Sequence, residues 1–139
     1  ENMGLAQVKR VAPEIRLDPE PVGVPRGRRP RLFALDAPSE GAVELQSQVE
    51  RRLVEARFYE PEKRPFWPHL TVARVRPERR GSRKPALVET PPGPLPEQLF
   101  RPFSAVRLTL YRSHLRPQGA EYIPMAVKDL KPAESTTER

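Results

Sequence analysis

The sequence predicts an α+β fold in which an antiparallel sheet packs against a helix. Short apolar segments alternate with polar residues along much of the chain, which indicates strands. One stretch after Ser39 instead repeats its apolar residues at helical spacing. The 139 residues include 19 prolines, which exclude a long helical array. The resulting order, strand, strand, helix, strand, loop, strand, strand, is typical of an α+β domain.

The first half of the chain supplies two strands and the helix. Residues 15–18 alternate apolar and charged side chains and predict a strand before the turn-rich stretch 19–30. Residues 31–36 form a compact apolar strand. Ser39 is a suitable N-cap for the helix that follows. The helix is indicated by Ala42, Leu45, Val49, Leu53 and Ala56.

The second half begins with an aromatic, proline-rich loop at 58–68. Residues 69–76 then alternate as a strand, with His69 and Thr71 on one face and Arg74 on the other. A long basic loop is predicted at 77–102.

Two further strands close the predicted fold. Residues 106–111 alternate and predict a strand, residues 113–121 are expected to turn around Gly119, and residues 122–127 form the last strand. The sequence thus predicts a residual segment at 1–12, one domain at 13–130 and a disordered tail at 131–139.

The formal charge of +7 rests mainly on arginine, which is clustered at 26–31 and 74–84. Guanidinium groups suit phosphates, and a basic surface attracts nucleic acid. A well-solvated surface without a ligand is the alternative interpretation. The absence of cysteine excludes disulfides and a cysteine nucleophile. No apolar stretch is long enough for a membrane span, so we expect no membrane partner and a cytoplasmic location.

His69 and Thr71 are the residues best suited to chemistry. Two positions apart on a strand, they point the same way, about 7 Å apart along it. The imidazole can take or give a proton near neutral pH, and the hydroxyl can donate to a phosphate oxygen. Pro68 disfavours helix and places His69 at the start of the strand. Taken alone, a histidine near a strand end is more often a surface residue than a catalytic one.

The stretch 62–76, Glu-Lys-Arg-Pro-Phe-Trp-Pro-His-Leu-Thr-Val-Ala-Arg-Val-Arg, closely resembles the second His-x-Thr-x motif of bacterial RNA 2′,3′-cyclic phosphodiesterases. These enzymes are two-histidine phosphoesterases, a superfamily that includes the 2′-5′ RNA ligase-like proteins. Residues 110–115 with 119–124 resemble the family's C-terminal signature, and residues 28–35 resemble the strand before its second long helix. Three signatures in the family's order cover about residues 13–127.

The resemblance implies part of a bilobal fold in which two His-x-Thr-x motifs face each other across a cleft. One histidine would activate water against a terminal 2′,3′-cyclic phosphate of RNA, and the other would protonate the departing ribose oxygen, leaving a 2′-phosphate. The threonines would hold phosphate oxygens, and neither a metal nor another cofactor would be needed. Related members also make or break 2′-5′ linkages in RNA. His69 and Thr71 match one catalytic motif.

The chain departs from the family pattern in one respect. It has two histidines, and His114 does not stand in a His-x-Thr-x motif. The first motif is expected on a strand well upstream of residue 13, and residues 1–12 do not supply it. We therefore expect a truncated first lobe and a chain that is crippled or inactive alone, since one proton-transfer group contributes about 10²–10⁴-fold.

Three further side chains are candidates for substrate binding. Arg74 matches an arginine that often follows the motif, and Arg64 lies in the loop before it. Tyr111 could stack on a base. The alternatives are a surface role for Arg74, a solvated loop position for Arg64 and a sheet-core role for Tyr111.

Three functions remain open. The first is a cyclic phosphodiesterase acting on RNA with a 2′,3′-cyclic phosphate or a 2′-5′ linkage. The second is a non-catalytic module that binds RNA ends or phosphate. The third is a homodimer that brings two copies of His69 and Thr71 face to face, although a monomer is favoured.

Overall fold

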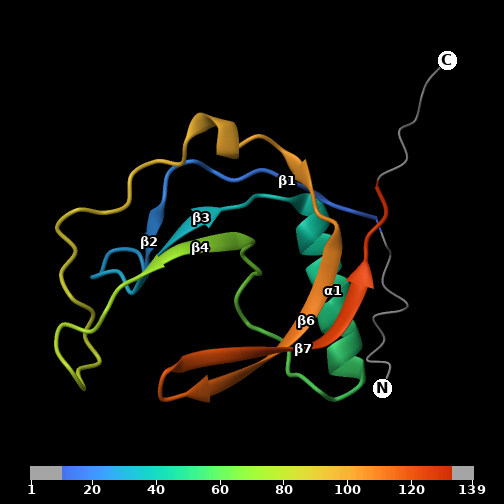
Figure 1. The fold of residues 1–139 in the computed structure, drawn as a ribbon. Coiled ribbons are helices and arrows are strands. Elements are labelled where there is room, and N and C mark those ends of the chain that lie inside the picture. The colour runs from blue at the N-terminus through green and yellow to red at the C-terminus, as the bar shows by residue number, and fades with distance from the viewer. Residues whose placement is uncertain (1–10, 133–139) are drawn as a thin grey trace. The chain divides into compact units, whose positions relative to one another are not determined.

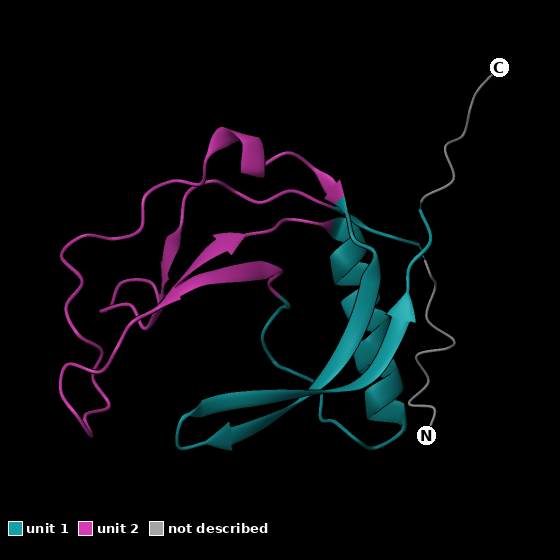
Figure 2. Ribbon diagram, in the orientation of Figure 1, with its two compact units in different colours: residues 1–14, 40–66, 104–139 teal, residues 15–39, 67–103 magenta. Residues whose placement is uncertain are grey.

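The computed structural model describes residues 11–132 (Figure 1). Most of the predicted N-terminal segment 1–12 and of the predicted tail 131–139 lies outside the described residues. The described chain divides into two compact units (Figure 2). Unit 1 contains residues 11–14, 40–66 and 104–132, and unit 2 contains residues 15–39 and 67–103. Antiparallel sheets and one α-helix in the described residues confirm the α+β class.

Unit 2 is built on a three-stranded antiparallel sheet in the order β2-β3-β4. The strands are β2 (Val22–Val24), β3 (Leu32–Asp36) and β4 (His69–Arg74). The central strand β3 carries the buried side chains of Phe33, Ala34 and Leu35. Its position between two strands explains why the compact apolar strand predicted at 31–36 is found almost unchanged.

β2 lies within the stretch 19–30 that the sequence predicted as turns. Val22 and Val24 pair with Ala34 and Leu32. The N–H of Arg31 donates to the Val24 carbonyl at 2.7 Å, which closes the connection between the two strands. The prediction was wrong because a three-residue strand between prolines gives too short an alternation to recognise.

A β-bulge interrupts the pairing of β3 with β4. The pairs run Asp36 with His69 through Ala34 with Thr71, and then Phe33 with Ala73 and Leu32 with Arg74. Val72 is therefore the extra residue, without a partner on β3. The regular alternation predicted for residues 69–76 consequently breaks at this position.

Unit 1 consists of helix α1 (Glu40–Glu55) and a long hairpin of β6 (Arg107–Arg116) and β7 (Gly119–Asp129). α1 lies along the hairpin (Figure 1). Leu45 is the buried centre of this contact. Around it pack Val49, Leu108, Leu110, Ala126 and Leu130. The helix begins directly after Ser39, as the sequence predicted.

α1 ends in a Schellman-type turn with an arginine at the left-handed position. Arg57 has φ 61°, where glycine is usual. The N–H of Phe58 donates to the Leu53 carbonyl and the N–H of Arg57 donates to the Val54 carbonyl, both at 3.0 Å. These two bonds satisfy carbonyls at the helix end and stop the helix.

The hairpin is longer than the sequence predicted. Strand pairing continues to Arg116 and Gly119, so the turn occupies Pro117 and Gln118 rather than 113–121. An ion pair between Arg116 and Glu121 joins the strands near this end. The prediction was wrong because Ser113 is a residue common in turns, and cross-strand pairing nevertheless holds it extended.

The remaining elements are short. β1 (Glu14–Ile15) and β5 (Phe103–Ser104) have two residues each, so the strand predicted at 15–18 is shorter and begins earlier. The predicted loop 77–102 is largely irregular and contains the 3-10 turn η2 (Glu97–Leu99). Its first part folds back on itself, because Pro77 and Pro85 form an antiparallel bridge.

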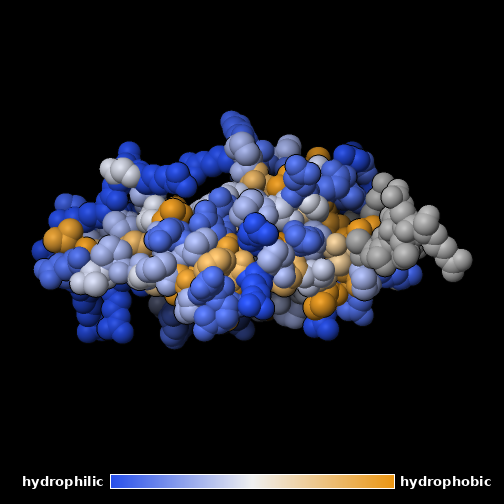
Figure 3. Space-filling view, turned by 90° about the horizontal axis from the view of Figure 1, so that it is seen from above, coloured by the Kyte–Doolittle hydropathy of each residue, from blue (hydrophilic) through white to orange (hydrophobic). Residues whose placement is uncertain are grey.

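The face seen in Figure 3 is mainly hydrophilic, with hydrophobic residues scattered among the polar ones. This agrees with the charged composition and net charge of +7.

Candidate active site

His69 is the first residue of β4 and is exposed. Pro68 ends the preceding loop, and its carbonyl accepts a hydrogen bond from the N–H of Ala37 at 3.0 Å. This bond ties the loop to the end of β3 just before the histidine. The prediction that the proline places His69 at the start of a strand is confirmed.

The ring of His69 is held by Trp67. The imidazole stacks on the indole with centroids 4.3 Å apart and planes 16° from parallel. Nδ1 of His69 lies 2.7 Å from the Trp67 carbonyl oxygen. A carbonyl can only accept, so Nδ1–H is the donor. In the neutral ring this leaves the lone pair on Nε2, which is therefore the atom that can take a proton from a substrate or water.

Trp67 is in turn anchored by Asp36. The indole Nε1–H donates to Oδ1 of Asp36 at 3.0 Å. Asp36 also pairs in register with His69 across the sheet. Asp36, Trp67 and His69 thus form a connected group in which the carboxylate holds the indole and the indole residue orients the imidazole. The sequence did not single out Asp36, because the contact joins residues 31 positions apart.

Thr71 is half-buried on β4 and pairs with Ala34. Directly paired residues of antiparallel strands have side chains on the same face of a sheet. Asp36, Ala34 and Leu32 alternate along β3 and share one face, so their partners His69, Thr71 and Arg74 share it too.

The bulge at Val72 thereby corrects the sequence-based orientation of Arg74. Regular alternation would turn Arg74 away from His69, but the extra residue reverses the alternation after Thr71. Arg74 is exposed. An imidazole, a hydroxyl and a guanidinium therefore stand in a row on one face of β4, which is a suitable set for a phosphate ester.

The other two predicted binding residues belong to unit 1. Arg64 is exposed in the loop after α1. Tyr111 on β6 meets Tyr122 edge to face, with ring centroids 6.4 Å apart. Tyr111 also lines a mainly apolar pocket of ≈ 740 Å³ between α1 and the hairpin, together with residues that include Leu53, Phe58 and Met125. Neither residue belongs to the unit that carries the histidine motif.

Tyr59, also in this pocket, has a perturbed acidity. Its hydroxyl donates to Oε1 of Glu62 at 2.7 Å. This hydrogen bond, together with desolvation and the nearby charges of Glu62 and Glu50, raises the pKa of Tyr59 to about 12. Tyr59 therefore stays neutral under ordinary conditions and serves to fix the loop after α1.

Within residues 11–132, no three His, Asp or Glu side chains are grouped in a way that could hold a metal ion. In the same part of the chain, no helix has both the length and the apolarity needed to cross a membrane.

Several solved structures resemble this chain, among them the two that follow. The protein TT0787 of Thermus thermophilus is 25% identical, with a TM-score of 0.61, and the match covers 92% of this chain and 66% of that one. A protein described as a phosphoesterase is 18% identical, with a TM-score of 0.60, covering 91% of this chain and 67% of that one. No family model and no curated protein matches the sequence. The chain spans about two thirds of each solved relative and has a phosphoesterase-like fold over that length.

Proposed function

We propose that this chain contributes one catalytic half of a phosphoesterase that opens terminal 2′,3′-cyclic phosphates of RNA and leaves a 2′-phosphate. The observation that carries the proposal is the shared face of His69, Thr71 and Arg74, with Nδ1 of His69 fixed by the Trp67 carbonyl. The phosphoesterase-like fold supports the general chemistry. The cyclic phosphate and the RNA come from the motif resemblance at 62–76.

The proposed reaction is an attack of water on phosphorus. The water oxygen bonds to phosphorus while the bond from phosphorus to the ribose O3′ breaks. One proton leaves the water and one proton arrives at O3′, so two proton-transfer groups are needed. His69 would be one of these two proton-transfer groups and would act through Nε2. Thr71 would donate to a non-bridging oxygen, and Arg74 would offset the phosphate charge.

The second proton-transfer group would come from another His-x-Thr-x motif, which this chain does not contain. The decisive assay therefore uses a 2′,3′-cyclic mononucleotide with two proteins: this chain, and a version that carries the residues encoded upstream of Glu1 in its gene. The extended protein should hydrolyse the substrate to the 2′-phosphate. This chain should be slower by about 10²–10⁴-fold.

His69→Ala in the extended protein should lower turnover by at least about 10²-fold. His114→Ala is the matched control, since His114 lies on β6 of the other unit, outside the motif, and should leave turnover unchanged. Full activity of His69→Ala would overturn the proposal. Slow turnover by this chain that depends on protein concentration would instead favour the homodimer.

A further inference from the structure

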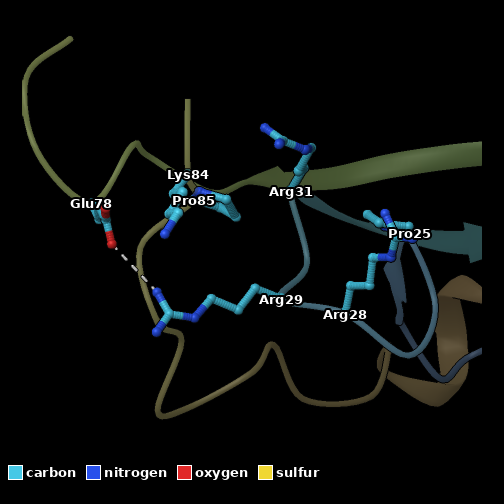
Figure 4. Close-up of a pocket in the computed structure, with 7 residues that line it drawn as sticks. All are labelled: Pro25, Arg28, Arg29, Arg31, Glu78, Lys84 and Pro85. Atoms are coloured by element: carbon cyan, nitrogen blue, oxygen red, sulfur yellow. Dashed lines mark hydrogen bonds and ion pairs between the residues drawn. The ribbon is translucent and has the colours of Figure 1, made fainter. Parts of the chain in front are cut away.

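Unit 2 contains a basic pocket at the end of its sheet remote from His69. The open pocket has a volume of ≈ 550 Å³ (Figure 4). It is lined by Pro25, Arg28, Arg29, Arg31, Glu78, Lys84 and Pro85. Arg31 directly precedes β3, whose first residue Leu32 pairs with Arg74, whereas His69 pairs with the last residue Asp36. Five residue steps at about 3.3 Å per residue separate the two ends, roughly 17 Å.

The pocket joins both arginine clusters of the sequence. The Arg31 carbonyl accepts from the N–H of Val75 at 2.9 Å, and its guanidinium Nη1 donates to the Arg83 carbonyl at 2.8 Å. The N–H of Glu78 donates to the Lys84 carbonyl at 2.9 Å, which closes the fold-back of the 77–85 segment. Strand ends and backbone bonds thus hold cations from distant parts of the sequence around one depression.

The charges in the pocket are unbalanced. Four cationic side chains stand against one carboxylate, Glu78. Glu78 pairs with Arg29 at 3.5 Å, with side chains 33% and 50% exposed respectively. An exposed pair at this distance contributes little to stability. The excess positive charge favours an anionic ligand, and guanidinium forks are suited to phosphate oxygens.

We propose that this pocket binds backbone phosphates of the RNA, a few nucleotides away from the terminal phosphate held at His69. The inference rests on the proposed function and adds the substrate's size to it. Arg74 pairs with Leu32, and the neighbouring residue Arg31 lines the pocket, so the pocket adjoins the end of the strand pair that carries Arg74. A mononucleotide at His69 is too short to span roughly 17 Å. The enzyme therefore prefers an oligonucleotide.

The test compares two substrates in the extended protein. One is a 2′,3′-cyclic mononucleotide, and the other is a single-stranded RNA of about ten nucleotides that ends in a 2′,3′-cyclic phosphate. This length lies within the range of single-strand binding sites. The pocket variant is Arg28→Ala with Arg29→Ala. The matched control is Arg79→Ala with Arg80→Ala, which removes the same charge from the tip of the 77–85 segment, outside the pocket. All four residues are exposed, so both variants should fold, which circular dichroism checks.

The pocket variant should lower kcat/KM for the oligonucleotide by about tenfold or more and leave that for the mononucleotide unchanged. The salt dependence of oligonucleotide binding should become less steep by about 1.4, since each phosphate contact on a single strand contributes about 0.7 to the slope. Equal losses on both substrates, or the same loss in the control variant, would overturn the proposal.

Fluorescence anisotropy of the labelled oligonucleotide separates this proposal from the proposed function. If neither substrate is hydrolysed but the pocket variant alone weakens oligonucleotide binding, the pocket stands and the catalytic proposal fails. If the mononucleotide is hydrolysed but both variants bind the oligonucleotide as the unaltered protein does, the catalytic proposal stands and the pocket fails.

Discussion

The indole of Trp67 lies flat against the imidazole of His69, with ring centroids 4.3 Å apart. The Trp67 carbonyl also accepts a hydrogen bond from the Nδ1–H of His69, and the indole Nε1–H of Trp67 donates to Asp36. One residue therefore controls the tilt of the histidine ring and the atom that carries its proton. Trp67 is therefore a positioning residue for the imidazole in the proposed reaction.

Trp67→Phe should keep an aromatic ring on His69 and lose the hydrogen bond to Asp36. We expect a loss of about 1 kcal/mol in the free energy of unfolding, measured by urea denaturation. Trp67→Leu should lose both the hydrogen bond and the stack on His69, and it should lower kcat on a cyclic phosphate. NMR of the imidazole nitrogens should show a less uniform Nδ1–H tautomer in the leucine variant, which a purely structural role would not produce.

Phe66→Leu is the matched control for Trp67, because Phe66 is an exposed neighbouring aromatic residue. It should leave both kcat and the tautomer unchanged. Wild-type kcat in Trp67→Leu would show that His69 does not depend on the indole.

Arg74→Ala should lower kcat/KM for a cyclic phosphate by about 10–100-fold, the value of a charge-assisted hydrogen bond. Arg74→Lys should recover only part of this loss, because lysine lacks the planar fork. Arg79→Ala removes a similar charge from the 77–85 segment and should retain full activity.

Deletion of Val72 tests the same face by geometry. Without Val72, the residues Thr71, Ala73 and Arg74 would pair regularly with Ala34, Phe33 and Leu32, so Arg74 would stay on the face of His69. The deletion should therefore retain much more of kcat/KM than Arg74→Ala does, provided circular dichroism shows an intact fold. Unchanged activity in Arg74→Ala would remove Arg74 from the site, and a deletion variant as impaired as Arg74→Ala would contradict the bulge at Val72.

Glu62→Ala should return the pKa of Tyr59 from about 12 toward its ordinary value of 10.0, because the hydrogen bond to Glu62 is the largest cause of the shift. A raised pKa favours the neutral phenol in the folded state. Its contribution to stability is therefore complete below pH 10 and is lost as the pH rises through about 12.

The titration of Tyr59 can be followed by the ultraviolet absorbance of the phenolate, with Tyr59→Phe assigning its share among the three tyrosines. Glu60→Ala removes a nearby carboxylate that does not bond to the hydroxyl and should leave the titration in place. A Tyr59 pKa near 12 in Glu62→Ala would contradict the assigned cause.

Arg57→Gly should stabilise the protein. Arg57 holds a left-handed conformation at φ 61°, which costs a residue with a Cβ roughly 1 kcal/mol and costs glycine little. We expect the free energy of unfolding to rise by about 0.5–1 kcal/mol in urea denaturation. Arg51→Gly, in the interior of α1, should instead destabilise by about 1 kcal/mol. A loss of stability in both variants would contradict this account of the helix end.

Local patterns in the sequence were sufficient for α1 and β3. Five apolar residues at helical spacing predicted α1, and the continuous apolar run at 32–35 predicted β3. The hairpin end at 113–116 was missed because its extended conformation depends on cross-strand partners such as Tyr122 and Glu121. Cross-strand pairing is non-local and leaves little trace in a strand's own residues.

The candidate site was likewise found only in part. His69 and Thr71 could be predicted because a short motif contains both. Asp36 could not, since its role depends on a hydrogen bond to Trp67 that only the folded sheet brings about. The joining of the two arginine clusters in one pocket also depends on sheet pairing, and neither cluster indicates it alone.

The unpaired Val72 has a consequence for how such motifs are compared between sequences. Same-face positions on a regular strand differ by an even number, yet His69 and Arg74 are an odd number of positions apart. A sequence pattern that requires an even number of positions after His69 would miss Arg74. It would instead accept an arginine at position 73, whose side chain would point to the opposite face of the sheet. In alignments, a one-residue gap between Thr71 and Arg74 would therefore remove the bulge and keep the arginine on the face of the histidine, so it would be a tolerated length difference.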